Sequence, residues 1–168
     1  MKNPILITER LILRKMNHDD AVHLLEIFSD PEAMRYYPST KNKKQTMEWI
    51  DWTLANYDKF DVGLWIVEDK ETGEFLGQCG IVPQDIDGVL EMEIGYLFVR
   101  RAWGNGYATE AAMACRNYGF NQLKLNRIIS LPDVNNIPST RVAERIGMTA
   151  EKKINKWSKE VFVYSVSK

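Results

Sequence analysis

The fold is decided by Arg101-Ala102-Trp103-Gly104-Asn105-Gly106, a stretch that lies between an apolar segment and an Ala-rich segment. Residues 90–99 predict a long strand, and residues 107–120 predict a helix. Because glycine has no Cβ, Gly104 and Gly106 would let an anionic group come close to the backbone. The start of a following helix adds unpaired N–H groups and a partial positive charge. The stretch therefore predicts a pyrophosphate-binding loop, and an ordinary turn is the alternative.

Two other kinds of phosphate-binding loop disagree with these residues. A dinucleotide-binding loop would have a third Gly or Ala where Thr109 stands. A Walker-type loop would have Lys-Ser or Lys-Thr after the last glycine, where Tyr107 and Ala108 stand. Arg100 and Arg101 add positive charge that suits phosphate oxygens. These comparisons favour a loop of the coenzyme A type.

Length and composition predict a globular protein of one domain, residues 1–168. Apolar residues make up 45% of the chain and charged residues 27%, and the formal net charge is −1. This charge gives no electrostatic reason to expect binding to nucleic acid or to an anionic membrane. No segment approaches the roughly 20 apolar residues of a membrane span. We therefore expect a cytoplasmic protein without a nucleic-acid or membrane partner.

The cysteines and histidines predict no metal site. Cys79 and Cys115 lie far apart in the sequence and are expected to be buried free thiols in a reducing compartment. His18 and His23 are five residues apart, so they would not stack on one helical face as metal ligands at i and i+4 would.

The order of the predicted elements favours an α/β or α+β layer fold. A run of antiparallel strands comes first, followed by a strand–helix–strand unit with a right-handed parallel crossover. Four helices are expected, over residues 17–28, 43–60, 107–120 and 137–146. Seven strands are expected, over residues 11–14, 64–68, 75–82, 90–99, 127–131, 152–157 and 161–166.

Three blocks along the chain resemble one known family. The loop, with Glu93-Ile94-Gly95-Tyr96 before it and Tyr107-Ala108-Thr109-Glu110-Ala111 after it, is similar to motif A of the GNAT superfamily of N-acetyltransferases. A downstream block resembles the same family at Asn136-x-x-Ser139-x-Arg141-Val142-x-Glu144-Arg145-Ile146-Gly147-Met148. A third resembles it at Thr8-Glu9-Arg10-Leu11-x-Leu13-Arg14. The subfamily most similar is the RimJ/RimL-like one, which acetylates the N-termini of ribosomal proteins.

The resemblance implies a mixed, mostly antiparallel sheet of about seven strands and about four helices. It implies that the sheet splays open between the strands at 90–99 and 127–131, with the pantetheine arm of acetyl-CoA in the opening. The implied cofactor-binding residues are Phe98, Val99, Arg100, Arg101, Trp103, Gly104, Asn105, Gly106, Tyr107, Ala108, Thr109 and Asn136. No metal is implied, and a homodimer is an expectation because the family is often dimeric.

The activity implied is transfer of an acetyl group from acetyl-CoA to a primary amine by direct attack. The acceptor is left open between a protein N-terminus and a small-molecule amine such as an amino acid, a polyamine or a drug. The alternative is a non-catalytic module that binds or senses acyl-CoA.

Acetyl transfer to an amine needs a group that accepts the amine's proton and a group that protonates the thiolate. Glu93 is the first candidate for the base, because the strand that carries it would flank the thioester. Glu91 is two residues away on the same face of a regular strand, and is a candidate for binding the substrate's ammonium. The alternative for both carboxylates is a position that faces solvent.

The proton donor is less clear, because Ala143 stands where many family members have a tyrosine. Ser139 is the motif residue expected to assist the leaving thiolate or bind the cofactor thiol, while Tyr96 and Tyr107 look less well placed. The alternative for Ser139 is a hydroxyl that bonds to the helix backbone.

The acceptor site is expected beside the aromatic loop at Tyr36 and Tyr37. Trp49, Trp52 and Trp65 lie near it in the predicted fold, but aromatic residues in such positions are more often part of the core. Only the two tyrosines are therefore predicted to line the acceptor cleft.

Overall fold

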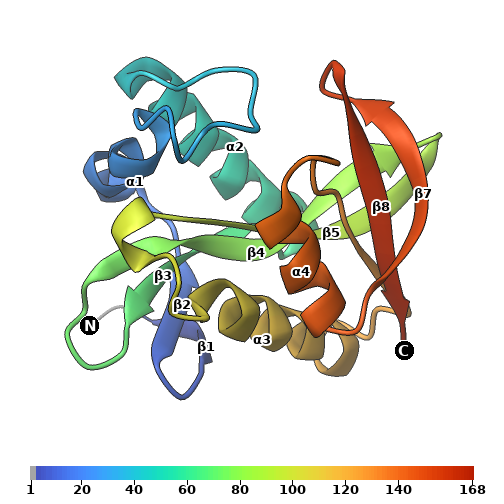
Figure 1. The fold of residues 1–168 in the computed structure, drawn as a ribbon. Helices are drawn as coiled ribbons and strands as arrows, with labels where there is room; N and C mark the ends of the chain where they lie inside the picture. Colours follow the sequence, from blue (N-terminus) through green and yellow to red (C-terminus); the bar gives the residue numbers. More distant parts are fainter. Residues whose placement is uncertain (1–2) are drawn as a thin grey trace.

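A computed structural model describes residues 3–168, which form an eight-stranded sheet with helices on both faces (Figure 1). The strands are β1 (Pro4–Ile7), β2 (Leu11–Lys15), β3 (Leu64–Asp69), β4 (Phe75–Ile86), β5 (Val89–Phe98), β6 (Arg127–Ser130), β7 (Thr149–Lys156) and β8 (Lys159–Ser167). Their order across the sheet is β1-β2-β3-β4-β5-β6-β8-β7. Every neighbouring pair is antiparallel except β5 and β6, which are parallel. The predicted mixed, mostly antiparallel sheet is confirmed.

The strand that sequence analysis missed is β1, at the edge of the sheet. It has only four residues, and its burial alternates too little to give a clear period-two pattern. It pairs with β2 through Leu6↔Leu13 and Ile7↔Ile12, with an irregularity after Pro4. A proline at the first position of an edge strand removes no ladder hydrogen bond from the interior of the sheet.

Four α-helices flank the sheet, as predicted. They are α1 (Ala21–Phe28), α2 (Lys43–Phe60), α3 (Tyr107–Asn121) and α4 (Ile137–Arg145), and short 3-10 helices precede α1 at η1 (His18–Asp20) and α3 at η2 (Arg100–Ala102). The expected start of the first helix at residue 17 is therefore a capped 3-10 turn, in which the Asn17 side chain accepts a hydrogen bond from the Asp19 N–H. Within residues 3–168, no helix is long and apolar enough to cross a membrane.

Two successive residues of β4 show which helix covers which face. The Trp49 indole on α2 donates to the Gln78 side chain at 3.1 Å, whereas the Cys115 sulfur on α3 lies 3.7 Å from the Cys79 sulfur. Because neighbouring strand residues point to opposite faces, α2 and α3 cover opposite faces of the sheet. The two thiols are buried as predicted, but they contact each other across the β4–α3 interface.

The sheet splays open between β5 and β6, as the family resemblance implied. Their parallel ladder has one registered pair, Glu93↔Ile129, whereas β4 pairs with β5 from Gly77↔Phe98 to Ile86↔Val89. Residues 94 to 98 at the end of β5 therefore have no ladder partner on the side of the opening. One contact near the start of the opening is the Ser130 hydroxyl, which donates to the Ile94 carbonyl at 3.2 Å.

The hairpin turns differ from prediction by one or two residues. The β4–β5 turn is centred on Asp87 and Gly88, with φ of 52° and 82°. Strand β4 therefore runs to Ile86, beyond its expected end at residue 82, whereas β5 keeps its expected length and begins one residue earlier. The β7–β8 turn is centred on Trp157 and Ser158, with φ of 55° and 61°. Two consecutive left-handed residues make a tight two-residue hairpin loop. This turn presents the Trp157 side chain at the tip of the hairpin.

Candidate active site

Two cavities meet at the splayed part of the sheet. The loop cavity, of about 1090 Å³, lies along residues 102–109, the N-terminal part of α4 and residues 32–37. The aromatic cavity, of about 400 Å³, lies between α2, residues 34–41, β5 and the β7–β8 hairpin. The residues that line both cavities are Tyr36, Tyr37, Tyr96, Leu97, Asn136 and Ser139. A molecule bound in one cavity would therefore reach a molecule bound in the other at these residues.

The glycine loop has the backbone form that sequence analysis expected. Gly104 and Gly106 adopt φ of 80° and 77°, a left-handed conformation that side-chain-bearing residues rarely take. A Cβ at Gly104 would meet no atom within 4 Å, so this side of the loop is open. Gly106 stands just before the first residue of α3 and exposes the helix N-terminus to the cavity. The backbone therefore offers N–H groups to an anion without steric obstruction.

Arg10, from the β1–β2 turn, fixes the loop from outside. Its guanidinium donates to the Asn105 carbonyl at 2.8 Å and to the Glu110 carboxylate at 2.7 Å, and it lies 4.6 Å from the centre of the Tyr107 ring. Thr8 also donates to Glu110, at 2.6 Å. The N-terminal block that resembled the family thus holds the phosphate-type loop against the start of α3.

The structure brings most of the predicted cofactor-binding residues to the loop cavity. Those that line it are Phe98, Trp103, Gly104, Gly106, Tyr107, Ala108, Thr109 and Asn136. Val99 is instead buried at 1% exposure. The Asn105 side chain turns back to the Ala102 carbonyl at 2.9 Å, so it shapes the loop.

The side chains of Arg100 and Arg101 do not line the loop cavity. Arg100 donates twice to the Asp30 carboxylate, at 3.0 and 2.9 Å. Arg101 forms ion pairs with Glu26 and Glu74. These acidic groups come from α1, the segment after it and the β3–β4 turn, and they hold both guanidinium groups on the outer side of the loop. The expected role of both arginines as phosphate ligands therefore lacks support from their positions.

Three other arginines line the loop cavity and were missed as candidate ligands: Arg35, Arg141 and Arg145. Arg141 and Arg145 lie four residues apart on α4 and so share a helical face. Both stood in the downstream block that resembled the family, and their spacing was the available signal. Arg35 lies in the connection between α1 and α2, where no sequence pattern pointed to the cavity.

Glu93 lines the aromatic cavity and is 9% exposed. The Gln84 amide donates to its carboxylate at 2.9 Å. Burial raises the pKa of Glu93 to about 7, although the hydrogen bond from Gln84 and the charge of Lys156 oppose that shift. A carboxyl group with this pKa exchanges a proton near neutral pH, as a general base does.

Glu91 lines neither cavity. Its carboxylate accepts hydrogen bonds from Arg127 on β6 at 3.1 and 3.0 Å, and Arg127 also pairs with Glu151 on β7. The expectation that Glu91 binds the substrate is therefore not supported, because a neighbouring strand supplies its cationic partner.

Residues 10–149 match a family model described as an acetyltransferase (GNAT) domain. The chain belongs to the GNAT acetyltransferase family. It is 52% identical over 160 residues to the uncharacterized protein YkkB of Bacillus subtilis (strain 168), covering 95% of this chain and 93% of YkkB. The predicted GNAT resemblance is thereby confirmed.

Solved structures share the GNAT fold of this chain. The crystal structure of an acetyltransferase from Agrobacterium tumefaciens str. C58 has 30% identity and a TM-score of 0.86, covering 100% of this chain and 96% of that one. RimL, the ribosomal L7/L12 alpha-N-protein acetyltransferase, was solved in complex with coenzyme A and has a TM-score of 0.79. Its identity is 16%, with 98% of each chain covered, so it shows the shared fold alone.

In this GNAT chain, Tyr96 and Ser139 meet where the cavities join. The Tyr96 hydroxyl donates to the Ser139 carbonyl at 2.7 Å, and the Ser139 hydroxyl donates to the Tyr96 oxygen at 3.2 Å. Burial raises the pKa of Tyr96 to about 12, so the phenol keeps its proton at neutral pH. The sequence favoured Ser139 over Tyr96 as the proton donor, but the structure joins the two residues by hydrogen bonds.

Asn136, the N-cap of α4, holds Ser139 in place in this part of the GNAT site. The Asn136 side chain caps the helix by accepting from the Ser139 N–H at 3.2 Å, so it fixes the residue that contacts Tyr96. Ala143, at the position where the family resemblance led us to expect a tyrosine, is fully buried and lines neither cavity.

The aromatic residues divide between core and cavity. Tyr36 and Tyr37 line both cavities, at the place expected for an acceptor site. Trp65 is 1% exposed and packs against Tyr118, with ring centres 5.5 Å apart, so it belongs to the core as expected.

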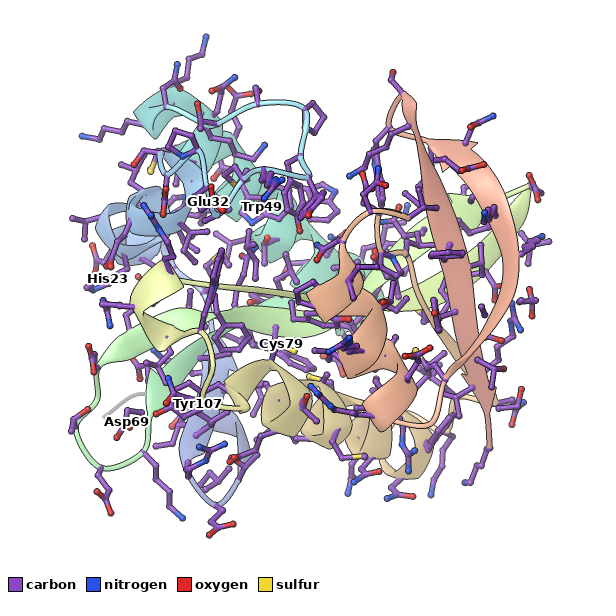
Figure 2. The ribbon with its side chains drawn as sticks, in the orientation of Figure 1. His23, Glu32, Trp49, Asp69, Cys79 and Tyr107 are labelled. Carbon is purple, nitrogen blue, oxygen red and sulfur yellow. The ribbon has the colours of Figure 1, made fainter. Side chains whose placement is uncertain are left out.

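Trp49 and Trp52 are different, because both line the aromatic cavity. Figure 2 shows Trp49 on the α2 side of the central strands and Tyr107 beyond them at the start of α3. The expectation of a core position is wrong for Trp52, which is 39% exposed. Trp157 also lines this cavity. The sequence predicted it as the last residue of the strand at 152–157 and gave no reason to place it in the site.

Proposed function

We propose that this GNAT protein transfers the acetyl group of acetyl-CoA to a primary amine by direct attack. The observation that carries the proposal is Glu93, a buried carboxyl with a pKa of about 7, in the cavity that joins the loop cavity. We propose further that residues 1–168 act as one cytoplasmic domain. The acceptor classes considered are a small-molecule amine and a protein N-terminus, the latter being what RimL is named for.

The residues of the loop cavity fit an acyl-CoA. The open backbone at Gly104 and Gly106 and the start of α3 suit the pyrophosphate. The phosphate of acyl-CoA that lies outside the pyrophosphate needs positive charge, and the cavity supplies it from Arg35, Arg141 and Arg145. Beyond Glu93, the end of β5 has no ladder partner on the side of the opening, so its backbone N–H and C=O groups can bind the amides of the pantetheine arm.

Glu93 would accept a proton from the attacking nitrogen, directly or through water. An alkyl amine with a pKa near 10.4 is mostly protonated at neutral pH, so a base is needed to release its lone pair. The new bond joins that nitrogen to the thioester carbonyl carbon, and the carbon–sulfur bond breaks. The ammonium form loses two protons in all: one moves to Glu93 and frees the lone pair, and the second passes to water once the carbon–nitrogen bond has formed. One further proton must reach the sulfur.

Tyr96 would supply the proton to sulfur. Its hydroxyl is protonated at neutral pH, lies where the cavities join and is oriented by Ser139 on α4. The phenol regains its proton from solvent after the products leave. This arrangement accounts for acetyl transfer in a chain that has Ala143 at the position of the family's tyrosine.

We expect Tyr96→Phe to lower kcat by about 100-fold, the lower end of what a positioned proton donor contributes. The KM for acetyl-CoA should change little, since the ring and its packing remain. Steady-state release of the coenzyme A thiol measures both constants. Ser139→Ala removes only a supporting hydrogen bond and should cost a few-fold; a larger loss there than in Tyr96→Phe would make Ser139 the donor.

Removing the α4 arginines should weaken cofactor binding. We expect the Arg141→Ala, Arg145→Ala double variant to raise the KM for acetyl-CoA by about tenfold or more, since each charge-assisted hydrogen bond contributes about 1.5–3 kcal/mol. The effect should shrink at high salt because these side chains border an open cavity. Lys44→Ala, which removes an exposed cation from α2, is the matched control. An unchanged KM would place the phosphates elsewhere.

The experiment that tests the function is thiol release from acetyl-CoA in the presence of a panel of amines. Release that depends on an amine, with the acetylated amine found by mass spectrometry, would support the proposal. Acetyl-CoA binding measured by calorimetry without release for any amine would favour a binding module. Absence of acetyl-CoA binding would refute both.

A further inference from the structure

The aromatic cavity is lined by flat apolar side chains from separate parts of the chain. Besides Tyr96, they are Phe28, Tyr36, Tyr37, Trp49, Trp52 and Trp157. Tyr37, Trp52 and Trp157 are 43%, 39% and 44% exposed, although large aromatic residues gain most from burial. They come from the α1–α2 connection, α2 and the β7–β8 turn, and they converge on one cavity. Exposed aromatics gathered around a cavity mark a binding wall.

Four charged side chains line this cavity, and two of them, Lys159 and Asp133, neutralise each other. Lys159 lies 3.3 Å from the Asp133 carboxylate and also donates to the Tyr36 carbonyl. Lys41 lies over the rings of Phe28 and Trp49, at 5.9 and 5.2 Å from their centres. Within residues 3–168, Glu93 is the lining carboxylate that forms no ion pair. The cavity therefore offers one negative group to one ammonium.

This arrangement disfavours two classes of acceptor. A polyamine carries at least two ammonium groups, and the second would lie in the cavity without a carboxylate, at a large desolvation cost. A peptide N-terminus brings backbone N–H and C=O groups that need partners, whereas the exposed rim has tryptophan and tyrosine rings. The volume of about 400 Å³ lies in the range of small-molecule sites.

From this wall and this single unpaired carboxylate, we propose that the acceptor is a small monoamine with a flat, aromatic body. Its amine lies toward Glu93, and its ring lies among Tyr37, Trp52 and Trp157. The proposal rests on the acetyltransferase function proposed above and names the substrate class of the same site.

The test compares kcat/KM for three amines at saturating acetyl-CoA. The probes are 2-phenylethylamine, 1,5-diaminopentane and a short peptide with a free N-terminus. We expect 2-phenylethylamine to exceed each of the others by at least tenfold. A preference for the diamine or the peptide, or three similar values, would overturn the inference.

Two variants connect this preference to the wall. We expect Trp52→Ala and Trp157→Ala each to lower kcat/KM for 2-phenylethylamine by fivefold or more, with the KM for acetyl-CoA unchanged. Trp52→Phe should recover part of the loss, because it keeps a flat ring. Val22→Ala, which truncates an apolar side chain that is 69% exposed on α1, is the control. Equal losses for all three amines in the tryptophan variants would argue against recognition of the ring.

The outcome also separates this inference from the function on which it rests. If acetyl-CoA does not bind, the proposed function fails and the inference fails with it. If amine-dependent thiol release occurs without preference for the aromatic amine, the inference alone fails.

Discussion

Glu93→Gln is expected to lower kcat for amine acetylation by about 100- to 1,000-fold, within the roughly 100- to 10,000-fold that a positioned general base contributes. Glutamine keeps the size of the side chain and can keep the hydrogen bond from Gln84, but it cannot accept the proton. The loss should appear mainly in kcat, with the KM for acetyl-CoA unchanged, because Glu93 lines the aromatic cavity and not the loop cavity. Steady-state thiol release measures it.

The pH profile distinguishes a base from a structural carboxylate. In the unchanged protein, kcat/KM should rise with pH through about 7, because Glu93 must lose its proton to act. The rise near 7 should vanish in Glu93→Gln, leaving only the rise at higher pH from ionisation of the free amine. Glu160→Gln, a change of an exposed carboxylate on β8, should keep the original profile. Retention of the step near 7 in Glu93→Gln would assign it to another group.

The fold was predictable because its decisive signals are local in sequence. The two glycines between a strand and an Ala-rich helix marked the crossover. Apolar residues at helical spacing marked α2, and start or stop residues marked α1 and α4. Strand β1 was missed because four partly exposed edge residues carry little pattern. The hairpin turns shifted because Asp87, Trp157 and Ser158 adopt left-handed conformations that any model based on glycine alone overlooks.

The sequence predicted only the part of the site that the backbone of one short loop forms. The loop at Gly104 and Gly106 needed no knowledge of distant residues. Arg101 forms ion pairs with Glu26 and Glu74, which are remote in sequence. Its position next to the loop in the sequence was therefore not enough to predict a contact with phosphate. Tyr96 became a candidate because the packing of α4 brings Ser139 to it, a contact between residues 43 positions apart.

The buried charge of Glu93 should also cost stability, and this can be measured without any substrate. The ordinary pKa of this carboxyl is 4.5, and burial raises it to about 7 in the folded protein. Between these pH values the folded state holds a proton that the unfolded state releases, so the free energy of unfolding falls as pH rises from 4.5 to 7. At 1.36 kcal/mol per pH unit, the full loss above pH 7 is about 3 kcal/mol.

Glu93→Gln removes this titration, so the variant should gain stability relative to the unchanged protein as pH rises. We expect the difference in the free energy of unfolding, variant minus unchanged, to be about 3 kcal/mol more favourable at pH 8 than at pH 4.5. Urea denaturation of both proteins at several pH values measures it, and any constant effect of the amide cancels in the comparison. Glu160→Gln should show no such trend. A difference that is the same at every pH would mean that the Glu93 carboxyl is hydrated in the folded protein. The assignment of Glu93 as a base with a pKa near 7 would then be wrong. The burial that lowers stability above pH 7 is the same burial that holds the proton on this carboxyl near neutral pH.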